Sequence, residues 1–328
     1  MEKSEFDLIK SYFAPLASGY EEAFDLLNDA ALISEKPQAS TVVTMDTLIA
    51  GVHFLMSDPA GDIARKCLRV NLSDLAAMGA AAFGYSLSMA YNSQIDVGWV
   101  KEFTTALGED QQRFSCHLIG GDTVVTPGPL TITITCFGSV ARHQCLKRNT
   151  AEVGEDVWVS GDLGDSAAGL KLLNKELDVS DAEARAQLIH RYRVPEPRCD
   201  LGIELLQNAI SRTAMDVSDG LLADLGHIAR ASNIAVELYE DKIPRSAAFS
   251  ALMSSSPDLG LALAVTGGDD YEIVFTSDPA QEQAIQELSR KLSLKLSKIG
   301  KVVSGHGVRL ICRNGKTFLP TKAGWTHF

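Results

Sequence analysis

Residues 70–80 read Val70-Asn71-Leu72-Ser73-Asp74-Leu75-Ala76-Ala77-Met78-Gly79-Ala80, a stretch that places one carboxylate inside an apolar run. The pattern predicts a helix over residues 60–80 that ends at Gly79, followed by an apolar strand over 81–91. An unpaired carboxylate among leucine and alanine side chains costs free energy. We therefore expect Asp74 to bind a cation, with a structural hydrogen bond as the alternative.

Five further aspartates stand in short motifs rich in glycine, serine and other small or polar residues. These motifs are Asn28-Asp29-Ala30-Ala31, Met45-Asp46-Thr47, Gly120-Gly121-Asp122-Thr123 and Asp216-Val217-Ser218-Asp219-Gly220. Carboxylates gathered in one cleft repel one another unless cations lie among them. Mg²⁺ prefers oxygen ligands and commonly shares one or two carboxylates with substrate phosphates. The motifs therefore favour a Mg-dependent enzyme acting on phosphates, although any single aspartate could instead be a helix cap or turn residue.

The bulk composition limits the class of protein. A chain of 328 residues favours two domains, and its formal net charge of −12 argues against a nucleic-acid or anionic-membrane partner. The same charge means that a polyphosphate would need metal ions to bridge it to the acids. The six cysteines form no CxxC pair, and no segment approaches the roughly 20 apolar residues of a membrane span. We expect a cytoplasmic protein with reduced thiols.

The order of predicted elements indicates an α+β fold and not a doubly wound parallel sheet. Residues 130–138 alternate with period two, residues 262–266 are predicted to be a strand, and Asn314-Gly315 predicts a hairpin turn between 308–312 and 317–319. The chain becomes polar over 141–155, which suggests domains at 1–145 and 146–328.

No established phosphate-binding loop is present. Gly315-Lys316-Thr317 lacks the upstream glycine of a P-loop, because Leu310 occupies that position. We expect phosphate to be bound through aspartate-held Mg²⁺, backbone N–H groups at Gly120-Gly121, helix N-termini, and the cations Lys147 and Arg148.

Taken together, these motifs resemble the thiamine-monophosphate kinase family, within the wider group that includes aminoimidazole ribonucleotide synthetase and selenophosphate synthetase. The resemblance extends over nearly the whole chain. It is carried by Asp46-Thr47-Leu48-Ile49-Ala50-Gly51-Val52-His53-Phe54, the 70–80 stretch, Leu118-Ile119-Gly120-Gly121-Asp122-Thr123, Asp216-Val217-Ser218-Asp219-Gly220-Leu221, Gly267-Gly268-Asp269-Asp270-Tyr271-Glu272 and Gly324-Trp325-Thr326-His327-Phe328.

The resemblance implies two mixed α/β domains of the aminoimidazole ribonucleotide synthetase type. The first would bind ATP and Mg²⁺ and form a homodimer, and the second would complete the substrate site. The positions that match metal ligands are Asp29, Thr44, Met45, Asp46, Asp74, Asp122, Asp216 and Asp219. Those that match nucleotide contacts are Gly121, Asp122, Arg148 and Ser218, and those that match thiamine phosphate contacts are His53, Asp269 and Trp325.

Three positions depart from the family pattern. Asn28 replaces one carboxylate of a Gly-Asp-Asp motif, Met45 stands where Ser or Thr is usual, and Asp269 replaces a glutamate. The change at Met45 is harmless if the ligand there is the backbone carbonyl, and weakens one Mg²⁺ site if it is a hydroxyl.

By the resemblance, the activity is direct transfer of the γ-phosphoryl group of ATP to thiamine monophosphate, with several Mg²⁺ ions. The acceptor phosphate is already ionised near neutral pH, so no general base is expected. Charge stabilisation would come from the metal ligands and Arg148. Two alternatives remain, namely another ATP-dependent synthetase of the same fold and a non-catalytic Mg-nucleotide-binding dimer.

Overall fold

The computed structural model describes residues 5–27, 30–31, 33, 38–320 and 324. The chain divides into two compact units. The first comprises Met1–Leu75 and Ala80–Gln144, and the second comprises Ala76–Gly79 and Cys145–Phe328. Asn28, Asp29 and Trp325, which the sequence singles out, lie outside the described residues.

The first unit carries one sheet and the helices packed on it. Its elements in chain order are α1 (Glu5–Leu8), α2 (Ala14–Ala17), β1 (Ala39–Ile49), α3 (Ala60–Ala77), β2 (Ala81–Tyr91), α4 (Val97–Phe114), β3 (His117–Val125) and β4 (Thr131–Ala141). A wider helical turn over Ile9–Phe13 joins α1 to α2. The helix predicted to end at Gly79 is confirmed, and Gly79 takes the positive φ of +71° that commonly follows a helix end.

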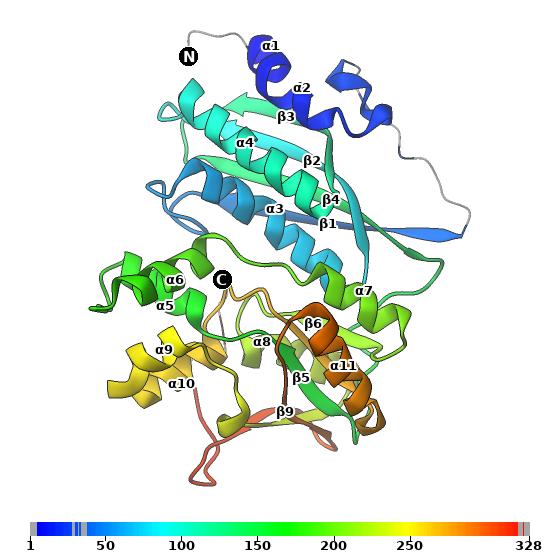
Figure 1. Cartoon of the computed structure of the whole chain (residues 1–328), viewed down its shortest axis with the longest axis vertical. Coiled ribbons are helices and arrows are strands. Elements are labelled where there is room, and N and C mark those ends of the chain that lie inside the picture. The colour runs from blue at the N-terminus through cyan, green and yellow to red at the C-terminus, as the bar shows by residue number, and fades with distance from the viewer. Residues whose placement is uncertain (1–4, 28–29, 32, 34–37, 321–323, 325–328) are drawn as a thin grey trace. The chain divides into compact units, whose positions relative to one another are not determined.

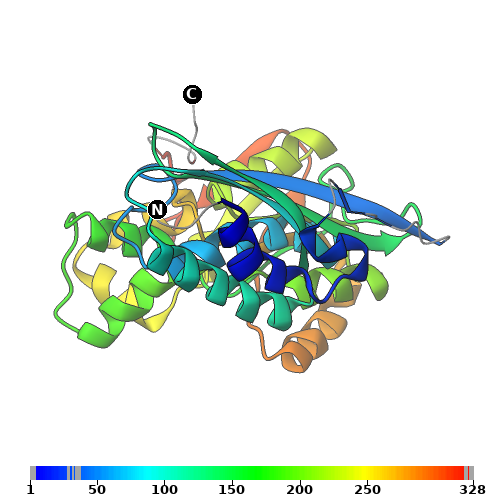
Figure 2. The ribbon, with the colours of Figure 1, turned by 90° about the horizontal axis from the view of Figure 1, so that it is seen from above.

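The sheet of the first unit has the strand order β1-β4-β2-β3. Its pairs are antiparallel except for β2 with β3, which is parallel. Helices α3 and α4 lie on one face of the sheet (Figure 1), and the turned view shows the same layering (Figure 2). The period-two pattern of β4 is confirmed, since Ile132, Ile134 and Cys136 are all fully buried. The sheet thus has a helix-covered face and an outward face.

The second unit is a larger sheet between helices. Its elements are β5 (Asp156–Ser160), α5 (Asp165–Leu173), α6 (Ala182–Arg193), α7 (Cys199–Gln207), β6 (Thr213–Asp216), α8 (Leu221–Ser232), β7 (Ala235–Tyr239), α9 (Ala247–Leu252), α10 (Pro257–Thr266), β8 (Ile273–Ser277), α11 (Glu282–Leu292), β9 (Leu296–Val303) and β10 (Gly307–Ile311).

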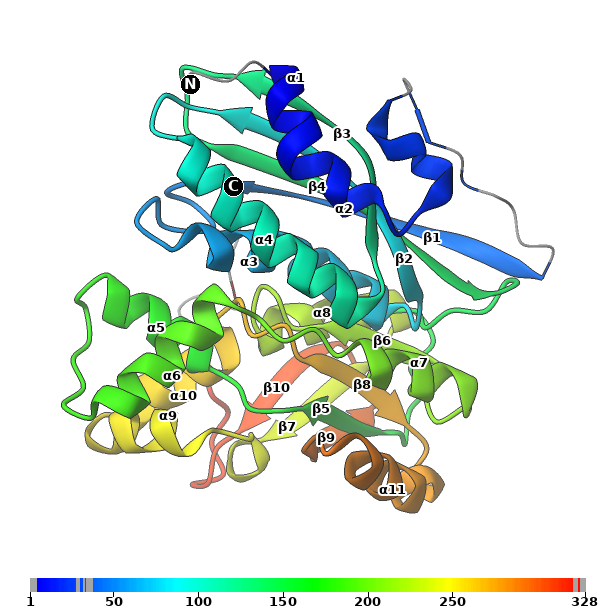
Figure 3. The same ribbon diagram turned by 45° about the horizontal axis from the view of Figure 1, so that its top comes forward.

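These strands follow the order β10-β7-β9-β5-β8-β6, with only β10 and β7 parallel (Figure 3). Successive side chains of β5 point to opposite faces of this sheet and so belong to two different parts of the core. Val157 and Val159 pack with α5, α8 and α10, whereas Trp158 packs with α7 and α11. The α+β class is therefore confirmed.

Two predicted elements differ from the structure. Residues 262–266 belong to helix α10 and not to a strand, because the helix is apolar on nearly all sides and so shows no helical period. The turn at Asn314-Gly315 forms, with Cys312 N–H donating to the Lys316 carbonyl at 2.8 Å. Only a single bridge from Ile311 to Thr317 follows it, since β10 pairs with β7 instead.

Each of the described helices is too short or too polar to cross a bilayer.

Candidate functional site

In the first unit, β1 and α3 bring three predicted metal ligands together. Thr44 and Asp46 are two residues apart on β1, so both point to the helix-covered face. There Thr44 Oγ1 donates a hydrogen bond of 2.5 Å to Asp74 Oδ2 of α3. The intervening Met45 points outward with its side chain 63% exposed. A thioether is a poor ligand for Mg²⁺, so only the backbone carbonyl of Met45 suits that ion.

The two carboxylates at this place disfavour each other's charge. Burial, and then the charge of Asp74, raise the pKa of Asp46 to about 6. Oxygen donors of this kind, partly buried and mutually repelling, fit a hard divalent cation. Among the described residues no group of three His, Cys, Asp or Glu side chains forms a ready metal cage. These oxygen atoms fit a Mg²⁺ site in which phosphate oxygens supply the remaining ligands.

His53 lies in the turn after β1 and is held in a defined orientation. Its Nδ1 accepts a hydrogen bond from the Ile49 N–H at 3.0 Å. In the neutral ring the proton therefore resides on Nε2, which can donate to a phosphate oxygen. Lys66, only 2% exposed on α3, donates from Nζ to the His53 carbonyl at 2.9 Å. A buried cation thus fixes the turn that carries His53.

Gly121 and Asp122 lie at the opposite edge of the same sheet. Strand β3 continues through this motif to Val125, so Asp122 is a strand residue and not a helix cap or turn residue. Gly121 shares a row across the sheet with Asp46, through Leu87 and Ile134. Three strand spacings separate the ends of that row, roughly 14 Å in a flat sheet. Asp122, the next residue, is exposed and belongs to the outward-facing row with Ser88. The structure therefore does not group Asp122 with Asp46 and Asp74.

A pocket of about 150 Å³ opens beside this strand. It is lined by Gly120–Thr123 on one side and by Ala30 and Ala31, which follow the Asn28-Asp29 motif, on another. Apolar side chains from the first helical turns, including Ile9 and Phe13, complete the lining. The pocket places the glycine pair predicted to contact nucleotide on a concave surface.

In the second unit, Asp216, Ser218 and Asp219 lie on the connection from β6 to α8. Asp216 ends β6 and is 3% exposed, and Gly220 then takes a φ of +119°. A Cβ atom at Gly220 would lie 2.8 Å from the Thr266 carbonyl, so glycine is required there.

A single buried carboxylate organises this connection. Asp224 Oδ2 accepts hydrogen bonds of 3.1 Å from the backbone N–H groups of Ser218, Asp219 and Gly220. Burial, and then the nearby charge of Asp219, raise the pKa of Asp224 to about 7. Sequence reasoning missed Asp224, although an acid in the first turn after a Ser-Asp-Gly motif is a recognisable helix-start signal.

The connection from β6 also pairs with the loop that carries Asp269. Asp269 N–H donates to the Ser218 carbonyl, and Tyr271 N–H to the Val217 carbonyl, both at 2.8 Å. The predicted nucleotide contact Ser218 and the predicted substrate contact Asp269 are thus held side by side.

Arg148 lies on the exposed segment before β5. Its carbonyl accepts a hydrogen bond from Ser232 Oγ at 2.9 Å. Burial, with the positive charges of Arg230 and Arg148, lowers the pKa of His227, while Asp219 acts in the opposite direction. The charges of Arg148 and Asp219 therefore both act on His227, in opposite directions.

Comparison with known proteins gives matches over almost the whole chain. Residues 27–140 match the family described as AIR synthase related protein, N-terminal domain, and residues 152–313 match the corresponding C-terminal domain. A protein of Caulobacter vibrioides named thiamine-monophosphate kinase is 39% identical over 326 residues, covering 99% of this chain and 91% of the relative.

Solved structures give the same result. The thiamine-monophosphate kinase of Stenotrophomonas maltophilia superposes with a TM-score of 0.84 at 37% identity, covering 94% of this chain and 98% of that chain. AaThiL, solved in complex with AMPPCP and TMP, superposes with a TM-score of 0.79 at 28% identity. That match covers 98% of this chain and 96% of AaThiL.

Proposed function

The chain belongs to the thiamine-monophosphate kinase family, and we propose that it transfers the γ-phosphoryl group of ATP directly to thiamine monophosphate, forming thiamine diphosphate. The observation that carries the proposal is the match over nearly the full length of AaThiL, a protein solved with AMPPCP and TMP. That match includes 98% of this chain, so both of its units have counterparts in AaThiL.

We propose one group of metal and nucleotide contacts in the first unit and another in the second. Asp46 and Asp74, with Thr44 and the Met45 carbonyl, would hold Mg²⁺, which when bound supplies positive charge to the phosphates. We assign further metal contacts to Asp29, Asp122, Asp216 and Asp219, and nucleotide contacts to Gly121, Asp122, Arg148 and Ser218. The 2.5 Å contact of Thr44 with Asp74 and the pKa of Asp46 support the first group.

The acceptor contacts are assigned to His53, Asp269 and Trp325. His53 Nδ1 accepts the hydrogen bond from the Ile49 N–H, and its Nε2–H would donate to the acceptor phosphate. Asp269 would complement the cationic thiazolium ring, at shorter reach than a glutamate. Each of these residues binds or orients the acceptor, and none has to remove a proton.

The proposed mechanism is positioning and electrostatic stabilisation. The acceptor phosphate is ionised near neutral pH, so the protein only has to align the two phosphates and offset their charge. Arg148 would neutralise developing charge on the transferred group. No phosphoenzyme forms. We further propose a cytoplasmic homodimer built on the first unit, with neither nucleic acid nor membrane as a partner.

An ADP-release assay tests the proposal. The purified chain with MgATP should release ADP only when thiamine monophosphate is present, and thiamine diphosphate should appear in equal amount. ADP release independent of thiamine monophosphate would favour another ATP-dependent synthetase. Nucleotide binding without turnover would favour a non-catalytic dimer. Asp74→Asn serves as the inactive control.

A further inference from the structure

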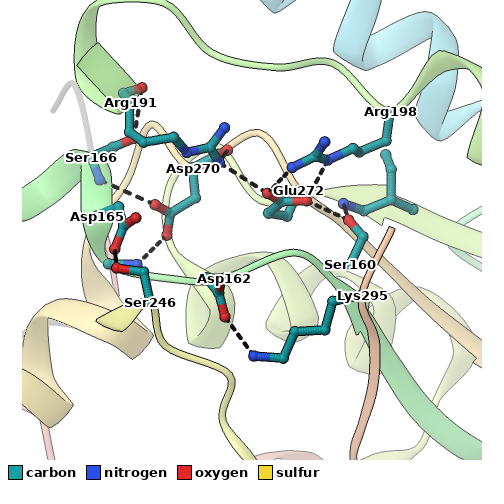
Figure 4. Close-up of polar contacts among 12 residues, drawn as sticks. Ser160, Asp162, Asp165, Ser166, Arg191, Arg198, Ser246, Asp270, Glu272 and Lys295 are labelled. Atoms are coloured by element: carbon teal, nitrogen blue, oxygen red, sulfur yellow. Dashed lines mark hydrogen bonds and ion pairs between the residues drawn. The ribbon is translucent and has the colours of Figure 1, made fainter. Parts of the chain in front are cut away.

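A fully buried glutamate in the second unit is held by two arginines. Glu272 is 0% exposed, and its carboxylate accepts hydrogen bonds from Arg198 Nε at 2.7 Å and Nη2 at 2.5 Å. Arg191 Nη2 adds a third at 2.9 Å and Ser160 Oγ a fourth at 2.6 Å (Figure 4). A Cβ atom at Gly161 would lie 2.1 Å from Glu272 Oε1, so the chain leaves room for this carboxylate.

The same cluster holds the loop from Gly267 to Glu272. Arg191 Nη2 also donates to the Asp270 carbonyl at 3.3 Å. The Asp270 carboxylate, 1% exposed, accepts from the Gly164 N–H at 2.8 Å. Figure 4 shows Arg191 between Asp270 and Glu272, the residues on either side of Tyr271. One arginine therefore fixes the backbone before Tyr271 and the side chain after it.

Two residues of the loop have unfavourable backbone conformations, which the surrounding contacts have to hold in place. Asp269 and Tyr271 have φ angles of +67° and +50°, in the left-handed region that residues other than glycine rarely adopt. Such conformations cost free energy and persist only where the surroundings impose them. Asp269 is a proposed acceptor contact, so the strain occurs at a residue whose side-chain orientation affects acceptor binding.

Stability alone is a weak reason for this arrangement. Replacing a buried ion cluster by apolar residues is often neutral or stabilising, because desolvation offsets the attraction. We infer that Arg191, Arg198 and Glu272 are positioning residues that hold Asp269 in its strained conformation for acceptor recognition. This inference rests on the proposed function and deepens it, since it assigns specificity for thiamine monophosphate to residues that do not touch it.

Arg191 offers the cleanest test, because Glu272 keeps both hydrogen bonds from Arg198 when Arg191 is removed. Arg191→Gln should raise the KM for thiamine monophosphate about tenfold, as expected for a misdirected contact, and leave the KM for MgATP within about twofold. Arg191→Lys keeps the charge and one of the two contacts. Its KM for thiamine monophosphate should lie between those of the wild type and Arg191→Gln.

Lys298 is the matched control. It forms two ion pairs in the same unit, with Asp156 at 3.2 Å and Glu282 at 2.6 Å, and its side chain is 30% exposed against 18% for Arg191. Lys298→Gln should lower the melting temperature and leave both KM values unchanged.

A double-mutant cycle separates positioning from a general effect. In an Asp269→Ala background, Arg191→Gln should add little further increase in the KM for thiamine monophosphate, because the residue it positions is gone. Additive effects would overturn the inference, as would an Arg191→Gln variant with reduced stability and an unchanged KM. Absence of thiamine monophosphate phosphorylation by the wild-type chain would overturn the proposed function and this inference with it.

Discussion

Thr44 Oγ1 donates a hydrogen bond of 2.5 Å to Asp74 Oδ2, linking β1 to α3 beside a second carboxylate, Asp46. Burial and the charge of Asp74 raise the pKa of Asp46 to about 6. Two partly buried acids that disfavour each other's charge lower the stability of the metal-free protein. A cation between them would relieve that repulsion, which links metal binding to the stability of the first unit.

Asp74→Asn should therefore lose most activity without loss of the fold. The amide oxygen can still accept from Thr44, but the charge that attracts Mg²⁺ is absent, and we expect kcat to fall about 100-fold. In metal-free buffer the melting temperature should stay equal or rise slightly, since one repulsive charge is removed. Steady-state kinetics at saturating Mg²⁺ and thermal melting check both parts. Near wild-type kcat would contradict the metal-ligand role of Asp74.

Thr44→Val provides the control for that variant. It removes the hydrogen bond to Asp74 and retains both carboxylates, so the loss of activity should be smaller than in Asp74→Asn.

MgATP should raise the melting temperature by mass action, because it binds the folded protein only. At a concentration of 100 times its Kd the stabilisation is about 2.7 kcal/mol. ATP with excess chelator should produce a much smaller shift, since the formal net charge of −12 disfavours a bare polyphosphate. Differential scanning fluorimetry measures the two shifts. Equal shifts would show that basic side chains, and not aspartate-held metal, carry the phosphates.

Local sequence signals predicted those elements that have a clear hydrophobic period or a residue that ends the element. The alternation of residues 130–138 and the glycine at the end of α3 were sufficient for β4 and α3. The five-residue apolar segment 262–266 was wrongly predicted as a strand, because a short buried run has no visible period and α10 is apolar around its circumference.

The candidate site was predictable only where its motifs are local. The Asp46 and Asp74 motifs are visible in the sequence alone, but only the tertiary fold shows that Asp74 of α3 is bonded to Thr44, two residues before Asp46 on β1. Arg198 and Glu272 are 74 positions apart, and no local pattern joins them. Burial of a carboxylate by distant arginines is a property of the tertiary fold, so this cluster could be found only in the structure.

The outward face of β1 is where we expect the proposed homodimer to form. Val43 is 57% exposed on a strand at the edge of the sheet, where apolar side chains favour association. Val43→Lys should convert a dimer into a monomer of 35.3 kDa, because a two-fold interface would bring both lysines together. Light scattering after size exclusion measures the mass. Val153→Lys, a change at an equally exposed valine of the second unit, should leave the dimer intact.

The C-terminal tryptophan provides the test of acceptor specificity. The thiazolium ring of thiamine monophosphate is cationic, and such a ring prefers the face of a tryptophan. Gly324, the preceding residue, packs closely enough on the Asp219 carbonyl that a Cβ atom would lie 2.6 Å away. The chain therefore passes beside Asp219 at Gly324.

Trp325→Ala should raise the KM for thiamine monophosphate by roughly 5- to 30-fold, equivalent to about 1–2 kcal/mol of lost stacking, with the KM for ATP nearly unchanged. A tryptophan that served only the core would behave differently. Trp158, 5% exposed and stacked on Phe275 with ring centroids 6.5 Å apart, provides that comparison. Trp158→Phe should lower the melting temperature and preserve both KM values. If Trp325→Ala reproduces the Trp158→Phe behaviour, Trp325 is a core residue and the acceptor must be recognised elsewhere.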